Sequence, residues 1–363
     1  MYDLLDDIAI FDLQDPALTP FKNLLLWEDR WIESVKMNKR GTNTIKSYES
    51  GLRSFYPFVK RHRKIPIDKI GAKYINRYLI DYQISLAVEA VASKNLKKGY
   101  LDELIKESKK KSIGSNDANF TVLEEFENTL SHRVTVVKIF LKFITENNKD
   151  QHDYTAVFNK ITKIKIADKF TDYLTMDELH QVVEYMSVWP QIYKDHKSKS
   201  SLRYAYRDAS LMIIYALTGG RSNEVVHIKL KEISESKDKQ HYFIRINKGK
   251  GGKKRVVSIP QTYLKPFLEY FRAELPSDDY YISSTYKKGY TNIPMNPNTI
   301  RTFSNDILRI LDINKTGLHA FRRGYVTKRI GGDEVDISLV AKEVGNTVAI
   351  LEKHYLKHSA DIL

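Results

Sequence analysis

Apolar residues recur every three to four positions through most of the first 150 residues, the spacing that places them on one face of an α-helix. This period predicts four helices, over residues 20–37, 43–61, 73–91 and 121–147. Pro57 lies inside the second of these, so we expect a kink or an early end there, because proline interrupts helical hydrogen bonding. The first half of the chain is therefore predicted to be helical.

The second half mixes helical and strand patterns. Thr175 and Glu178 have the spacing of a capping box, in which two side chains satisfy free N–H groups where a helix begins. Two β-rich runs, residues 241–247 and 254–259, flank a glycine-rich segment and predict a hairpin. Further helices are predicted over residues 204–217, 263–274, 297–311, 319–330, 338–344 and 351–356. Helices with a small antiparallel sheet, without alternating βαβ units, indicate an α+β fold.

A chain of 363 residues exceeds the usual size of one compact core, so we expect two domains. Residues 147–151 are a polar break, and residues 160–171 are a basic stretch that we interpret as a linker. The predicted organisation is a helical domain over residues 1–160, a linker over residues 161–172 and a mixed domain over residues 173–363.

The chain is basic, with a net charge of +14 and a pI near 9.4. The charge is uneven, because residues 1–35 carry −6 and the remainder carries +20. Such a field suits a polyanion, since each Lys or Arg placed against a phosphate releases counterions. Residues 94–119 are polar and include three successive lysines; we favour a solvated helix face or a mobile loop, with an element that contacts DNA as the alternative.

Cysteine is absent, which excludes disulfides and cysteine-ligated zinc and fits a reducing compartment. The N-terminus is acidic and lacks the basic region of a secretory signal. The longest apolar stretches, such as residues 211–217, are too short to span a bilayer. We therefore expect a cytoplasmic protein without a membrane partner.

Three basic positions could hold a phosphate. Arg221 follows Gly219-Gly220, so the chain can turn sharply there and present a guanidinium, which donates two parallel hydrogen bonds. Taken alone, such an arginine is more often a surface residue; Glu224 could orient it, or the two could form a simple surface pair. His319 and Arg322 are spaced i and i+3 and share one helix face.

A lysine and a tyrosine complete the set. Lys250 lies at the tip of the predicted hairpin, where a backbone can approach a DNA strand, although a basic tip that merely touches phosphate is the alternative. Tyr355 lies 33 residues after Arg322 and is one of 23 tyrosines, so a packed aromatic side chain is its alternative reading. A phenol becomes a nucleophile at neutral pH only where cations stabilise the phenolate.

The order and spacing of these five residues resemble the tyrosine recombinase family, and the chain is most similar to bacterial Xer recombinases of the single-recombinase type, such as XerH and XerT. The resemblance implies that Tyr355 is the nucleophile, that Arg221 and Arg322 clamp the phosphate, and that Lys250 protonates the leaving oxygen. Lys248, Lys253 and Lys254 compete with Lys250 for the role of general acid. The same three lysines are also expected to contact DNA, together with Arg323, Lys46 and Arg53. His319 would donate to a non-bridging oxygen or help move the proton.

One position departs from the family pattern. Members usually carry His or Trp nine residues before the nucleophile, after a glycine, whereas this chain has Asn346 after Gly345. Asparagine can donate a hydrogen bond to a phosphate oxygen but cannot shuttle a proton. Reduced or altered activity is therefore an open interpretation.

The resemblance implies a fold and a function. A helical core-binding domain and an α+β catalytic domain would close as a C-shaped clamp on double-stranded DNA, and a homotetramer would assemble on two sites. No metal and no cofactor are expected. The expected task is chromosome dimer resolution at a dif-like site, with a DNA translocase of the FtsK type as a candidate partner. A mobile-element integrase or transposase of the same family, a catalytically weak DNA-binding protein derived from a recombinase, and a type IB topoisomerase-like enzyme are the alternatives.

Overall fold

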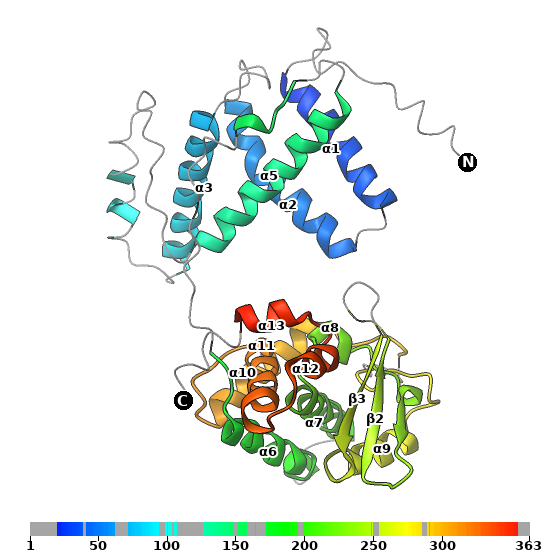
Figure 1. Cartoon of the computed structure of the whole chain (residues 1–363). Helices are drawn as coiled ribbons and strands as arrows, with labels where there is room; N and C mark the ends of the chain where they lie inside the picture. Colours follow the sequence, from blue (N-terminus) through cyan, green and yellow to red (C-terminus); the bar gives the residue numbers. More distant parts are fainter. Residues whose placement is uncertain are drawn as a thin grey trace, which may run out of the picture. The chain divides into compact units, whose positions relative to one another are not determined.

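The computed structural model describes residues 20–38, 41–61, 72–93, 126–148, 152–157, 172–194, 199–247, 254–284 and 291–354, with isolated positions at 99, 101–103, 105–106, 164, 249 and 289. The chain divides into two compact units between Lys169 and Phe170 (Figure 1). The predicted linker, residues 161–172, and the polar stretch, residues 94–119, lie almost entirely outside the described residues.

Unit 1 is helical. It contains α1 (Pro20–Met37), α2 (Thr42–Arg61), α3 (Ala72–Ala92) and α5 (Glu127–Asn147), so the predicted helices are confirmed within a residue at most ends. The predicted start of the fourth helix is wrong, because Phe126 precedes the first α-helical residue, and residues 121–125 are outside the described part.

The core of unit 1 is rich in aromatic side chains. Trp31 of α1 stacks on Tyr48 of α2 with ring centroids 4.9 Å apart, and lies 5.4 Å from the ring of Phe140 of α5. Gly51 allows α2 to approach α5 closely, since a Cβ there would meet Val136 at 2.6 Å. Aromatic packing and one close helix crossing thus hold the three helices together.

Of the two expectations at Pro57, a kink or an early end, the early end is wrong, because α2 continues to Arg61, the end predicted from the apolar period. Its buried face runs through Leu52 and Phe55 to Phe58, which lies beyond the proline. Burial of Phe58 in the core offsets the hydrogen bond that Pro57 removes.

Unit 2 contains a three-stranded antiparallel sheet in the order β1-β2-β3, formed by Ile233–Glu235, His241–Ile246 and Arg255–Pro260. Its helices are α6 (Met176–Lys194), α7 (Lys199–Thr218), α8 (Ser222–Val225), α9 (Gln261–Glu274), α10 (Pro297–Ile310), α11 (Leu318–Thr327), α12 (Ile337–Val344) and α13 (Val348–His354), with a π-helical turn at Lys328–Gly332 after α11. The predicted fold class, a helical domain followed by an α+β domain with a small antiparallel sheet, is confirmed. The clamp on DNA concerns how the two units sit, and stays a prediction.

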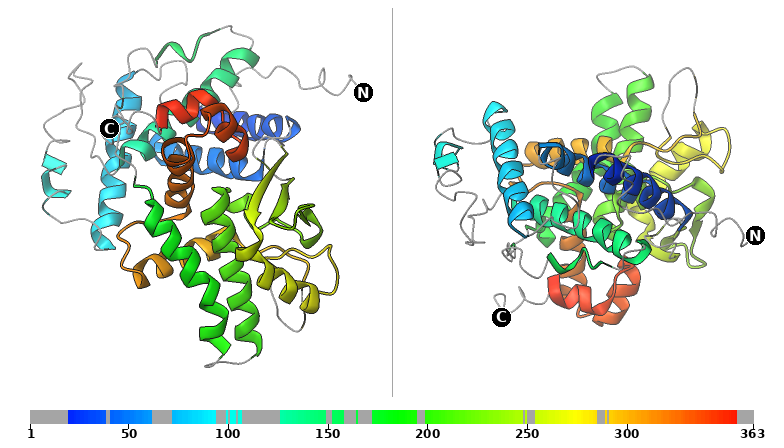
Figure 2. Two further views of the ribbon diagram at one scale, coloured as in Figure 1. Left: turned by 60° about the horizontal axis from the view of Figure 1, so that its bottom comes forward. Right: turned by 90° about the horizontal axis from the view of Figure 1, so that it is seen from above.

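Helix α7 is the centre of unit 2. It packs against α6 along its length and also contacts α9, α10, α11 and strand β3 (Figures 1 and 2). Its residues from Leu211 to Ala216 are buried, as the apolar run predicts. The capping box that opens α6 is confirmed: the Thr175 N–H donates to Glu178 Oε2 at 2.7 Å, and the Glu178 N–H donates to Thr175 Oγ1 at 3.3 Å.

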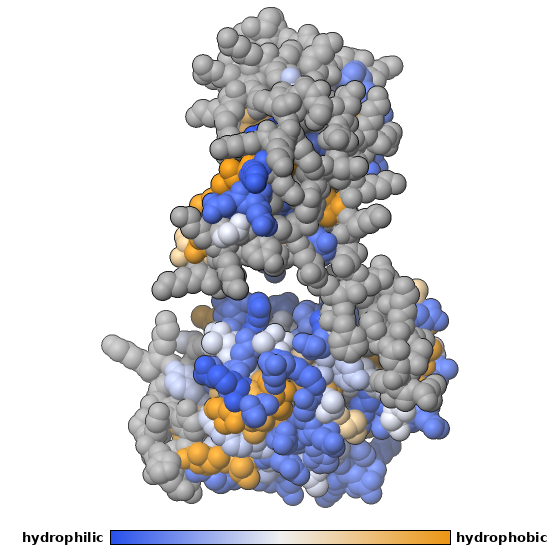
Figure 3. Space-filling view, turned by 90° about the vertical axis from the view of Figure 1, so that its left-hand side faces the viewer, coloured by the Kyte–Doolittle hydropathy of each residue, from blue (hydrophilic) through white to orange (hydrophobic). Residues whose placement is uncertain are grey.

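The surface and helices have two further properties. On the face drawn in Figure 3, the described part of unit 2 is mostly hydrophilic, with small apolar patches. Every helix among the described residues is too short or too polar to cross a lipid bilayer.

Candidate active site

The first candidate side chain, Arg221, stands where α7 gives way to α8. Helix α7 ends at Thr218, Gly219 adopts a φ of +56°, and Arg221 is the N-cap residue of α8. A Cβ on Gly219 would lie 2.8 Å from the ring of Tyr325, so the turn needs glycine for its backbone angle and for space. The Gly-Gly pair therefore makes the sharp turn that the sequence predicts.

The Arg221 guanidinium is held from three sides. Nη1 donates to Glu224 Oε1 at 2.9 Å, while Nη2 donates to the Gly345 carbonyl at 3.0 Å and to Asn346 Oδ1 at 2.8 Å. These partners come from α8 and from the turn after α12, so residues more than 120 positions apart meet here. The side chain is fixed before any substrate binds.

Glu224 is a buried partner, and the alternative of a simple surface pair is wrong. Its exposed fraction is 3%, and its Oε2 accepts from the Arg221 N–H at 2.9 Å and from Arg255 Nη2 at 2.6 Å. Burial raises the pKa of this carboxyl, but the hydrogen bonds and charges of Arg255 and Arg221 outweigh burial and lower the pKa to about 2. Glu224 is therefore ionised throughout the physiological range.

Arg322 lies on α11 with an exposed fraction of 4%. Nη1 donates to the Gly219 carbonyl at 2.7 Å, and Nη2 donates to the Val344 carbonyl at 2.6 Å. Arg221 Nη1 also lies 3.5 Å from the Val344 carbonyl oxygen. The two arginines thus converge on one backbone oxygen at the C-terminal end of α12, where the helix dipole favours cations.

His319 lies at the start of α11, one turn before Arg322, and its side chain is only partly exposed. The pKa of its imidazole is lowered from 6.5 by partial burial and then by the positive charges of Arg323, Arg322, Arg221 and Arg301. Gly317 precedes the helix with a φ of +76°, and its N–H donates to Asn305 Oδ1 at 2.8 Å. The ring is therefore a neutral group beside several cations.

Asn346 occupies the position where the family pattern has His or Trp. Its Oδ1 must face Arg221, because a guanidinium has no acceptor. Among the described residues the Nδ2 amino group has no hydrogen-bond partner, so it remains a donor for another acceptor. Gly345 before it is left-handed, with a φ of +64°, and ends α12.

Two key positions lie outside the described residues: Lys250, with its neighbours Lys248 and Lys253, and Tyr355. The described strands β2 and β3 flank the lysine segment, and α13 ends at His354, directly before Tyr355. The last helix begins at Val348, three residues before the predicted start at residue 351.

The residues proposed to contact DNA differ in exposure and in hydrogen bonding. Lys254, Lys46 and Arg53 are exposed, the last two on α2. Arg323 instead donates from Nη1 to the Asp172 carbonyl at 2.7 Å and is half-buried. It ties α11 to the start of unit 2 and also acts on His319 through its charge.

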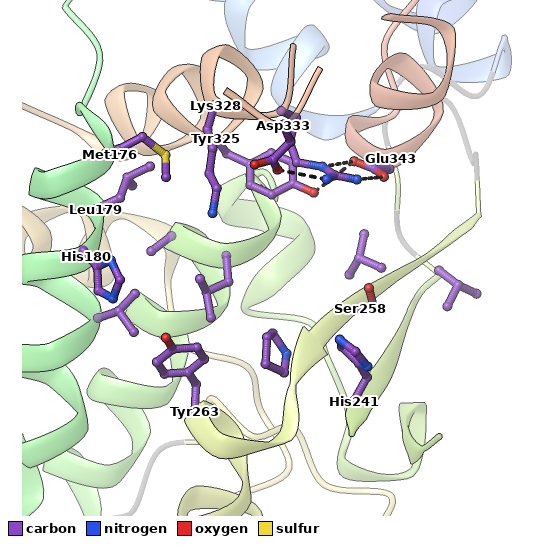
Figure 4. A pocket seen from close by; sticks show the side chains of 17 residues that line it. Met176, Leu179, His180, His241, Ser258, Tyr263, Tyr325, Lys328, Asp333 and Glu343 are labelled. Atoms are coloured by element: carbon purple, nitrogen blue, oxygen red, sulfur yellow. Dashed lines mark hydrogen bonds and ion pairs between the residues drawn. The ribbon is translucent and has the colours of Figure 1, made fainter. Parts of the chain in front are cut away.

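A cavity of about 400 Å³ lies between α6, α7, β3 and the π-helical turn (Figure 4). On one side Tyr325 donates to Glu343 at 3.0 Å, and Arg329 bonds Glu343 at 2.7 Å and Asp333 at 3.0 Å. Since the ring of Tyr325 also packs against Gly219, this network supports the turn that carries Arg221.

Arg255 is a site residue that sequence reasoning missed. It alternates with Val257 and Ile259, the buried positions of β3, so the two-residue period places an arginine on the core face. A charged residue in such a position needs a buried partner, which here is Glu224. That pattern is the signal that would have found it.

Residues 172–360 match the model of the phage integrase family. The chain belongs to this family, the tyrosine recombinases, which are DNA strand-transferring enzymes of site-specific recombination. Among curated proteins, it is similar to the tyrosine recombinase XerA of Pyrococcus furiosus, 24% identical over 154 residues, or 42% of this chain. The match spans about half (51%) of that relative's length.

Solved structures with the same fold include the XerH site-specific recombinase bound to a palindromic difH substrate in a post-cleavage complex. It is 16% identical, with a TM-score of 0.66 over 97% of both chains. A lambda integrase dimer bound to a COC′ core site is 13% identical, with a TM-score of 0.55 over 92% of this chain and 76% of that one. At these identities the likeness defines the fold.

Proposed function

We propose that this protein is a site-specific DNA recombinase that cleaves and rejoins DNA through a 3′-phosphotyrosine on Tyr355. The observation that supports it best is the convergence of Arg221 and Arg322 on the turn after α12, through the carbonyls of Val344 and Gly345. Two fixed guanidiniums beside each other suit one phosphate, whose two non-bridging oxygens each accept hydrogen bonds.

In the proposed mechanism Tyr355 attacks the scissile phosphorus, and Arg221 and Arg322 neutralise the charge of the five-coordinate transition state. Each fixed donor of this kind contributes on the order of 3 kcal/mol to lowering the barrier. Lys250 protonates the departing 5′-oxygen as general acid. The phosphotyrosine keeps the energy of the broken bond, so a 5′-hydroxyl of another strand can restore the DNA without ATP.

Asn346 and His319 would serve the phosphate oxygens in this scheme. Because Arg221 holds Asn346 Oδ1, the Nδ2 amino group is the part left to donate. Neutral His319 can donate one N–H to a non-bridging oxygen. Hydrogen-bond donation by Asn346 supports an active enzyme over the alternative of a catalytically weak DNA-binding protein.

The biological task, the assembly on DNA and the activating partner are parts of the same proposal. Chromosome dimer resolution at a dif-like site is supported by the likeness to XerH, whose structures contain difH DNA. A homotetramer on two sites is supported by the fold shared with a lambda integrase tetramer bound to a Holliday junction, with a TM-score of 0.55. A mobile-element integrase is the second candidate, and the likeness to lambda integrase favours it. An FtsK-type translocase is the proposed activating partner of the first.

The test uses sites selected by binding from a random duplex library. Two copies are placed on a supercoiled plasmid, and recombinant products are separated from relaxed circles on a gel. Recombination between the copies supports a recombinase, whereas relaxation of a plasmid with no site indicates a type IB topoisomerase-like enzyme. Binding without either product would overturn the proposed activity.

A further inference from the structure

Arg255, the first residue of β3, has a buried guanidinium whose side chain is 8% exposed. Its Nε is buried without a hydrogen-bond partner among the described residues. Replacing a buried ion pair by apolar side chains of similar size is often neutral or stabilising. A buried arginine with one unsatisfied N–H is therefore poorly explained by stability, which directs attention to its position.

One chain of contacts runs from Arg255 to Arg221. Arg255 Nη2 donates to Glu224 Oε2 at 2.6 Å, and the other oxygen of Glu224 accepts from Arg221 Nη1 at 2.9 Å. The carboxylate thus lies between two guanidiniums, and the position of each depends on the other. Without Arg255, Glu224 could rotate and Arg221 would lose a fixed acceptor.

A second contact joins the same two arginines through backbone. A Cβ on Gly345 would lie 3.1 Å from Arg255 Nη1 and 3.4 Å from Arg221 Nη1. Both guanidiniums thus lie against Gly345, and the Gly345 carbonyl accepts from Arg221. Arg255 acts on Arg221 both through Glu224 and through the Gly345 turn.

We propose that Arg255 is a positioning residue, which fixes the Arg221 guanidinium in the orientation that meets the scissile phosphate. This inference rests on the proposed function, in which Arg221 clamps that phosphate. Arg255 itself is turned toward Glu224 and Gly345, so it acts through Arg221 and has no direct role in the chemistry.

The charges around Glu224 make the inference testable by pH. Arg221 faces it from the start of α8 and Arg255 from β3. The third neighbour is Tyr215 of α7, whose phenol has its pKa raised by burial and then by the charge of Glu224. The hydrogen bond from Arg255 is the largest of the effects that lower the pKa of Glu224. Removing Arg255 should raise that pKa, so that Glu224 loses its charge, and its hold on Arg221, at a less acidic pH.

The experiment compares wild type with Arg255→Gln, Arg255→Lys, Glu224→Asp, Glu224→Gln and the double variant Arg255→Gln/Glu224→Gln. Arg309→Gln is the matched control, because it removes an exposed arginine from its ion pair with Asp306. The rate of covalent protein–DNA adduct formation is measured in single turnover across acidic and neutral pH, with DNA affinity measured in parallel. A thermal melt of each variant verifies folding.

We expect Arg255→Gln to slow adduct formation on the order of 10²-fold, as small misplacements of a reacting group do, with DNA affinity within about threefold of wild type. In Arg255→Gln the pH at which the adduct rate falls on the acid side should be higher than in wild type. Arg255→Lys should recover part of the rate and part of this pH shift. This fall in rate at acidic pH should be absent from the double variant, which has no carboxyl at position 224 to titrate. Glu224→Asp keeps the charge but shortens the reach, so it should slow the reaction at neutral pH.

A readout independent of catalysis separates the two proposals. Side-chain ¹⁵N NMR of arginine reports rotation about the guanidinium bonds, and Arg221 should rotate faster in Arg255→Gln. If wild type binds its site but forms no adduct, the proposed function fails, while the spectra still decide whether Arg255 holds Arg221. If wild type forms the adduct and Arg255→Gln matches it in rate, pH profile and Arg221 rotation, the positioning role is overturned.

Discussion

The carbonyl of Val344 shows how single residues prepare this site. Its oxygen accepts from Arg322 at 2.6 Å and lies 3.5 Å from a nitrogen of Arg221. Because it ends a helix, it carries partial negative charge that offsets the repulsion between two neighbouring cations. The two arginines are thus held next to one shared backbone oxygen without any bound substrate.

The surroundings of His319 predict the pH range in which its imidazole titrates. Its pKa is lowered by partial burial and then by Arg323, so the imidazole should titrate below 6.5, and Arg323→Gln should raise the midpoint. Since the unfolded chain then binds the proton more readily, the folded state should lose stability as the pH falls through about 6.5 and keep it above that pH. NMR titration of the His319 Hε1 signal measures the midpoint, and Arg309→Gln is the control. A midpoint at or above 6.5, unchanged in Arg323→Gln, would contradict this account.

Residue chemistry was only partly predictable from sequence. Arg221, His319 and Arg322 lie in local contexts that the sequence encodes, namely a glycine turn and one helix face. Arg255 was missed because its role comes from a contact across 31 positions, from β3 to Glu224. Neighbours along the chain give no sign of such a partner, although the alternation of Arg255 with Val257 and Ile259 marks it as buried.

At the scale of elements, long amphipathic segments were easy to predict and short ones were not. The helices of unit 1 and the β2–β3 hairpin follow their apolar periods. Strand β1 was missed because Ile233–Glu235 is only three residues, too few to display an alternating pattern. Helix α2 continues past Pro57 to Arg61, the end that its apolar period predicts, because burial of Phe58 outweighs the local cost of proline.

The turn between α7 and α8 is expected to be sensitive to substitution of Gly219. Gly219→Ala forces a positive φ on alanine and a contact with Tyr325, so it should destabilise unit 2 by about 2–4 kcal/mol. Urea unfolding measures the loss. Gly331→Ala is the control, since nothing lies within 4 Å of a Cβ there. Equal stability of the two variants would show that the turn is not packed as described.

At the scale of the whole molecule, two units with separate cores share one excess of positive charge. The net charge of +14 implies a strong dependence of DNA affinity on salt. Which surfaces contribute is not encoded in composition. The exposed Lys46 and Arg53 of α2 are our candidates in unit 1.

Lys46→Gln/Arg53→Gln should weaken DNA binding and reduce the slope of log affinity against log salt by about 1.8, since each phosphate contact contributes about 0.9. Fluorescence anisotropy across a salt series measures the slope. Lys265→Gln/Arg309→Gln removes the same charge from exposed positions on α9 and α10. An equal change in both variants would mean that the overall field, and not α2, is responsible.

The cleavage chemistry proposed for Tyr355 is tested most directly by covalent trapping on a nicked suicide duplex that carries the selected site. Cleavage of this duplex releases a short fragment that cannot rejoin, so a phosphotyrosine adduct accumulates and is seen on a denaturing gel. We predict an adduct with wild type and none with Tyr355→Phe, while both bind the duplex equally. An adduct that survives in Tyr355→Phe, or none from wild type on DNA that it binds, would contradict the account.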